Sequence, residues 1–137
     1  MIPLSSKLES REQEFVDVMK LLEEHQFSLG GNWDYQHGSF DRYLDEAHKV
    51  WLRIPFSVIH GHLDDQAEVN DATIRIGQPY VLKHVYNEGL DPEAQVQTLG
   101  GLINQFQSPV DSDAPIEQHW LDEAQTKLEQ VERLFPN

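Results

Sequence analysis

The sequence predicts an α+β fold, with an antiparallel β-meander of about five strands packed by an N-terminal helix and a long C-terminal helix. Three observations support this prediction. Residues 50–62 alternate with a period of two, residues 10–26 and 116–135 carry apolar stripes at helical spacing, and residues 27–87 contain short apolar runs joined by turn residues. Consecutive strands followed by helices favour an α+β class over a parallel βαβ sheet.

The stretch from Val50 to His62 is predicted to be the central strand. Its alternation places five apolar side chains on one core face: Val50, Leu52, Ile54, Phe56 and Val58. His60 and His62 continue that face at the C-terminal end of the strand, and Leu63-Asp64-Asp65 follows directly. Pro55 cannot donate to a hydrogen-bonded ladder, so it predicts a bulge or an edge position.

The first predicted helix runs from Ser10 to about Gln26 and is expected to begin with a capping box formed by Ser10 and Gln13. The second runs from Ile116 to Phe135. Their expected core stripes are Phe15, Val18, Met19 and Leu22 in the first, and Ile116, Trp120, Ala124, Leu128, Val131 and Leu134 in the second.

The remaining strands are predicted from apolar alternation between turn residues. Gly30-Gly31 lies within the first of them and predicts a bulge or the close approach of another backbone. The expected strands are 27–35, 39–45, 72–76 and 80–87, with a turn at 45–48; a broken helical segment over 92–107, interrupted at Gly100-Gly101, is expected to follow.

Composition limits the possible functions. A chain of 137 residues suits one domain, predicted here over 1–137. Its formal net charge of −14 argues against nucleic-acid binding, since the ten basic residues form no local patch. The absence of cysteine excludes disulfides and thiolate chemistry. With neither a secretory leader pattern nor a membrane-length apolar run, the chain is expected to be a cytoplasmic protein with no membrane partner.

The cluster His60-Gly61-His62-Leu63-Asp64-Asp65 is the candidate metal site. It resembles the HxHxDH signature of metallo-β-lactamases, but Asp65 stands where that pattern needs histidine, and the chain lacks the βα alternation of that fold. A looser divalent-metal site remains open, with His60 and His62 as ligands and Asp64, Asp65, His84 or His37 as the third. Alternatively, the two histidines are polar residues where a strand emerges into solvent.

A second apolar sheet face is predicted from Trp51, Ile59, Leu63, Val81 and Val85. Either the 92–107 segment or a second copy of the chain must cover it, and a symmetric homodimer with Trp51, Ile59 and Val85 at its interface is preferred.

The leading interpretation is therefore a non-enzymatic domain that binds an unidentified protein or small molecule and needs no cofactor. The alternative is a metal-binding protein or metal-dependent hydrolase, with Asp64 or Asp65 as a ligand or general base.

Several segments also resemble one family. They are IPLSSKLE (2–9), FSLGGNWDYQHGSFD (27–41), WLRIPF (51–56), ATIRIGQPYVLKHVYNEGLD (72–91) and GLINQFQSPVD (101–111). Together they are similar to the YugN-like family of small bacterial proteins. The resemblance implies one α+β domain in a cytoplasmic setting and implies no activity, cofactor or catalytic residue.

Overall fold

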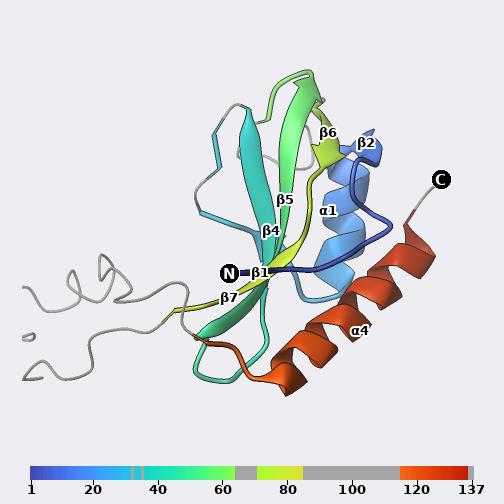
Figure 1. Ribbon diagram of the computed structural model, residues 1–137. Coiled ribbons are helices and arrows are strands. Elements are labelled where there is room, and N and C mark those ends of the chain that lie inside the picture. The colour runs from blue at the N-terminus through green and yellow to red at the C-terminus, as the bar shows by residue number, and fades with distance from the viewer. Residues whose placement is uncertain (32, 35, 64–70, 85–114, 136–137) are drawn as a thin grey trace, which may run out of the picture.

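A computed structural model describes residues 1–31, 33–34, 36–63, 71–84 and 115–135 (Figure 1). Seven strands and two helices lie in these ranges. In chain order they are β1 (Ile2–Pro3), β2 (Glu12–Glu14), α1 (Phe15–Glu24), β3 (Ser28–Leu29), β4 (His37–Tyr43), β5 (Val50–His60), β6 (Thr73–Ile76), β7 (Tyr80–Lys83) and α4 (Gln118–Leu134).

The strands form one antiparallel sheet organised around β5. The sheet follows the order β1-β7-β5-β4-β3, while β6 also pairs with β5 and β2 pairs with β6. β5 pairs along one edge with β4, and its other edge is divided between β7, opposite Val50 to Arg53, and β6, opposite Phe56 to His60. The α+β class with an antiparallel sheet is therefore confirmed, and β6 and β7 lie end to end along β5.

Pro55 lies where the partner of β5 changes from β7 to β6. Its carbonyl accepts a hydrogen bond from the Gly77 N–H at 2.8 Å, in the connection between the two strands. The carbonyl and the nitrogen of one strand residue face the same edge. The missing N–H of Pro55 therefore faces this connection, so proline is tolerated in the middle of the central strand without the predicted bulge or edge position.

Both described helices pack on one face of the sheet (Figure 1). The predicted apolar alternation of β5 is confirmed, because Val50, Leu52, Ile54 and Phe56 are all buried. All four predicted core residues of α1 are buried, as are Ala124, Leu128 and Val131 of α4, and these belong to the same core cluster as Phe40 and Ile74 of the sheet. The core thus lies between the sheet and the two helices.

The predicted start of the first helix is wrong. α1 begins at Phe15, and Glu14 precedes it without any side-chain capping bond. Ser10 has a φ of 70°, and its N–H donates a hydrogen bond to the Ile76 carbonyl at 2.7 Å. Gln13 lies in β2 and pairs with Ile74 of β6. Pairing with the edge of β6 therefore replaces the predicted capping box, because it satisfies the backbone groups that a helix would otherwise satisfy.

Two further expectations need correction. The strand predicted over 27–35 is limited to Ser28–Leu29. A Cβ added at Gly30 would lie 2.7 Å from Asp41 Oδ2 and 2.8 Å from Ser39 Oγ, so side chains rather than another backbone approach this glycine. Leu134, placed in the core stripe of the second helix, is 59% exposed at the end of α4. The segment predicted over 92–107 lies outside the described residues.

Candidate functional site

The two histidines of the predicted metal site do not continue the core face of β5. A register shift separates Val58 from His60, so the alternation that holds from Val50 to Phe56 is interrupted. The strand ends at His60, and Gly61 then adopts a φ of 74°. Both histidines are exposed, and the His62 N–H donates to Asp71 Oδ1 at 3.0 Å.

The third metal ligand is not identified. Asp64 and Asp65 lie outside the described residues, and His37 lies 3.7 Å from Asp34 Oδ1 in an exposed pair. Within the described ranges, no group of three or more His, Cys, Asp or Glu side chains could hold a metal ion. A divalent-metal site at His60, His62 and Asp64 therefore stays a prediction.

The side of the sheet away from the helices carries a different cluster, here called the outer face. It consists of two rows of residues paired across β4, β5 and β7. The register aligns Asp41 with Arg53 and Arg53 with Tyr80, and it aligns Tyr43 with Trp51 and Trp51 with Leu82. These positions alternate with the core positions Leu52 and Val81, so the outer face follows from strand periodicity.

The first row is polar and largely shielded from water. Arg53 donates from Nε to Asp41 Oδ1 at 3.0 Å and from Nη2 to Asp41 Oδ2 at 3.1 Å, a two-pronged pair. The Ser39 hydroxyl donates to the same carboxylate at 2.8 Å, and Asp41 is only 8% exposed. A buried charge needs such compensation, so the row forms a connected polar unit beside the close approach at Gly30.

The charges of this row affect the neighbouring titratable groups. Burial lowers the pKa of Arg53, but hydrogen bonds to Asp41 and Tyr80 outweigh this effect, so its pKa lies above the ordinary value. Burial lowers the pKa of His84, and the nearby charge of Arg53 lowers it further, against an opposing effect of Asp41. The raised pKa of Arg53 and the lowered pKa of His84 together favour a protonated guanidinium beside a neutral imidazole.

The second row is aromatic and partly open to solvent. Tyr43 is 49% exposed, and its ring stacks on His48 with centroids 3.8 Å apart. Trp51 meets both rings edge-on, at 5.8 Å from Tyr43 and 6.0 Å from His48. The Trp51 indole N–H donates to the His48 carbonyl at 2.7 Å. These contacts hold the three rings together at the hairpin between β4 and β5.

The structure revises the second face that the sequence predicted. Trp51 and Ile59 are partly exposed, which leaves them available as predicted interface residues, and Val85 lies outside the described residues. Val81 and Leu63 are fully buried in the core cluster instead. Val81 is buried because the register of β7 places it opposite the core residue Leu52. Leu82 is the residue opposite Trp51, and it is itself buried, with 4% of its surface exposed.

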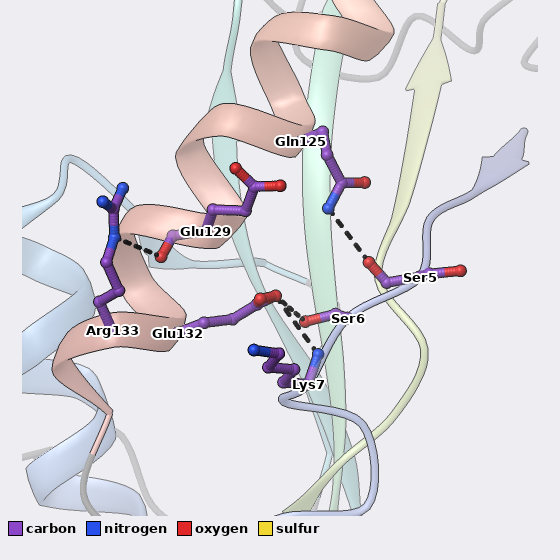
Figure 2. Close-up of a pocket in the computed structure, with 7 residues that line it drawn as sticks. All are labelled: Ser5, Ser6, Lys7, Gln125, Glu129, Glu132 and Arg133. Carbon is purple, nitrogen blue, oxygen red and sulfur yellow. Dashed lines mark hydrogen bonds between the residues drawn. The ribbon is translucent and has the colours of Figure 1, made fainter.

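A shallow groove of roughly 650 Å³ lies between α4 and the N-terminal segment (Figure 2). Glu132 Oε1 accepts hydrogen bonds from the Ser6 hydroxyl and the Lys7 N–H, both at 3.3 Å. Gln125 Nε2 donates to the Ser5 carbonyl at 3.2 Å. The groove is polar, and its lining groups largely hold the two chain segments together.

No described helix combines the length and the apolar composition needed to cross a membrane. The outer face and the polar groove are two candidate binding surfaces in the described ranges. Neither has the arrangement of a nucleophile, a base and an orienting group that acyl-transfer chemistry requires.

Comparison with known proteins agrees with the fold. The chain is 33% identical over 136 residues to the uncharacterized protein YugN of Bacillus subtilis (strain 168), with 96% of each chain covered. It is also similar to the crystal structure of the uncharacterized conserved protein YugN from Geobacillus kaustophilus HTA426, with a TM-score of 0.53, 22% identity, and coverage of 97% of this chain and 99% of that one. The model of the YugN-like family matches residues 3–135, and the chain therefore belongs to the YugN-like family.

Proposed function

We propose that this protein is a non-enzymatic binding domain that forms a homodimer through the outer face of its sheet. The observation that supports the proposal is the aromatic row, in which Tyr43, His48 and Trp51 hold one another at a partly exposed surface. Aromatic side chains are enriched in protein interfaces because they bury a large area with few rotatable bonds. Ile59, a partly exposed residue towards the other end of β5, is kept as a proposed interface residue.

Local charge also favours this surface. The whole chain carries a formal charge of −14, so two copies repel each other over most of their surface. On the outer face the charges of Asp41 and Arg53 compensate each other, and the accessible side chains beside them include the aromatic rings of Tyr43, Trp51 and Tyr80. A symmetric contact here brings together two surfaces of low net charge. Added salt screens the repulsion between the rest of the two chains and is expected to strengthen the dimer.

The same charge bears on partners and location. A net charge of −14 repels phosphate backbones, so nucleic acid is not among the proposed partners. The absence of cysteine fits a reducing compartment, and we place the protein in the cytoplasm as part of this proposal. Its further partner is a protein or small molecule that binds the domain without chemical change.

Sedimentation velocity over a wide range of protein concentration tests the homodimer. The informative variant is Tyr43→Glu, which puts a charge into the aromatic row at an exposed position. Leu134→Glu is the matched control, because Leu134 is a similarly exposed apolar residue at the end of α4. The proposal expects a dimer in the wild type and in Leu134→Glu, and a monomer in Tyr43→Glu. A wild-type monomer at every concentration, or a dimer unaffected by Tyr43→Glu, would overturn it.

A further inference from the structure

His84 belongs to the outer face of the sheet. Side chains alternate along β7, so His84 lies on the same side of the sheet as Tyr80. The His84 N–H donates to the Lys49 carbonyl at 2.8 Å, which extends the pairing of β7 with β5 by one residue. Lys83 has the opposite phase and reaches α4, where its Nζ lies 3.0 Å from Oε1 of Glu117. The half-buried His84 side chain therefore lies on the side that faces away from the helices.

Among the described residues, the charged groups that act on the His84 imidazole come from two strands. Arg53 of β5 disfavours its protonated form, and Asp41 of β4 favours that form less strongly. On the same face Tyr80 contributes a phenol from β7 itself. The other neighbour of β7 is β1, and its residues Ile2–Pro3 have no titratable side chain. The electrostatic surroundings of His84 are thus set mainly by the pair of Asp41 and Arg53.

The carboxylate of this pair is already engaged. Asp41 accepts hydrogen bonds from Arg53 at 3.0 and 3.1 Å, and it accepts another from the Ser39 hydroxyl at 2.8 Å. The pair balances one negative charge against one positive charge, so a proton on His84 adds a second positive charge beside Arg53. Two like charges on one face repel each other, and removal of water from a charged group is unfavourable.

Symmetry would double this effect in the outer-face dimer. A two-fold contact brings two copies of the same face together, so each copy adds one imidazole to the joint surface. The contact also removes water, which strengthens the repulsion between like charges that lie close together. The charge of the whole chain acts in the opposite direction, because a lower pH reduces the formal charge of −14 and weakens the general repulsion between copies.

We propose that His84 makes the outer-face dimer sensitive to pH, so that the dimer forms with neutral imidazoles and dissociates when they gain a proton. This inference rests on the homodimer proposed above and adds its regulation. Burial lowers the pKa of His84 within one copy, and the further loss of water in the dimer lowers this pKa again. The dimer is therefore strongest above the pKa that His84 has in the monomer, and it weakens as the pH falls through that value.

Sedimentation velocity at constant ionic strength, from about pH 7.5 to about pH 5.5, tests the proposal. Half of the imidazoles are charged where the pH equals the pKa of His84 in the monomer. The dissociation constant should rise about fourfold at that pH, because each of two copies contributes a factor of two. In His84→Gln the constant should stay level or fall slightly with pH. His60→Gln is the matched control, because His60 is an exposed histidine at the far end of β5, and it should follow the wild type.

The outcomes separate this inference from the homodimer itself. A wild-type dimer whose dissociation constant changes with pH as that of His84→Gln does would overturn the pH sensitivity and leave the homodimer in place. A rise of the constant that persists in His84→Gln would assign the effect to another group, such as His48 of the aromatic row, and would also overturn it. A wild-type monomer at pH 7.5 and every concentration would overturn both proposals.

A measurement on the wild-type chain keeps the test independent of how His84→Gln folds. The imidazole resonances of His84 are followed by NMR through the same pH range, at protein concentrations well below and well above the dissociation constant. The pKa of His84 should be lower in the concentrated sample, because the dimer holds the neutral form. The same pKa at both concentrations would contradict the proposed linkage.

Discussion

Truncation of Leu128 measures how firmly α4 is held against the sheet. Leu128 is fully buried and belongs to the core cluster. Leu128→Ala removes apolar contact worth about 2.5 kcal/mol and leaves a cavity that the neighbours fill only in part, so the expected total loss is roughly 3–4 kcal/mol. With an unfolding entropy of roughly 2.1 cal/mol/K per residue, a chain of 137 residues loses about 10 °C of melting temperature for 3 kcal/mol.

The assay is thermal and urea unfolding followed by circular dichroism. Leu134→Ala is the matched control on the same helix, because that side chain is 59% exposed and its truncation should change stability by no more than about 0.5 kcal/mol. The informative quantity is the difference in melting temperature between Leu128→Ala and Leu134→Ala. Equal melting temperatures would refute the packing of α4 through its Leu128 face.

Three further predictions concern the sheet. Arg53→Met leaves the buried Asp41 carboxylate without its cation, and it is expected to lower the free energy of unfolding in urea by about 2 kcal/mol. The double variant Arg53→Met/Asp41→Ala should recover part of this loss. If the effects of the two single substitutions on the free energy of unfolding are fully additive, the ion pair is contradicted. Gly38→Ala puts a Cβ 2.5 Å from a facing aromatic ring and should cost roughly 1–3 kcal/mol, while Gly31→Ala, with nothing within 4 Å, should be near neutral; similar melting temperatures would contradict this contrast. The pKa of His84 lies below 6.5 in the folded state, so the contribution of its neutral form to stability is complete above that pH and falls as the pH drops. The His84→Gln variant should therefore lose less stability than the wild type between about pH 7.5 and 5.5. Equal losses in the two proteins would oppose a lowered pKa for His84.

The central strand and the core faces of both helices could be predicted because burial there is strictly periodic. Val50, Leu52, Ile54 and Phe56 of β5 all face the core, and so do the four predicted core residues of α1. Such patterns are sufficient to predict the fold class, because a strand and a helix with these hydrophobic periods each bury one face. Leu134 shows the limit, because a periodic residue at a helix end need not reach the core.

The errors arise where tertiary contacts override a local pattern. Ser10 and Gln13 have the spacing of a capping box, yet pairing with β6 draws this segment into the sheet. The bulge after Val58 and the positive φ of Gly61 interrupt an alternation that the residue types alone would extend to His62. Bulges and left-handed residues depend on what lies opposite, here Thr73 and Asp71, which is not encoded in the spacing.

The outer face was only half predictable. The sequence predicts Trp51 on this face from its position between core residues of β5, and Arg53 lies two residues further along the same face. The alignment of Arg53 with Asp41 and Tyr80 depends on the register of two separate strand pairs. A shift of one residue would move each partner to the opposite face, so the cluster appears only once the register is known.

The hydrogen bond between Gln125 and the Ser5 carbonyl joins residues 120 positions apart and has a consequence for folding order. During synthesis the described sheet strands leave the ribosome well before α4, so the core face that Ala124, Leu128 and Val131 cover stays exposed until α4 is made. Contacts of such high sequence separation also slow folding, because a long loop must close before they form. The packing of α4 against the sheet is therefore expected to be a late step in folding.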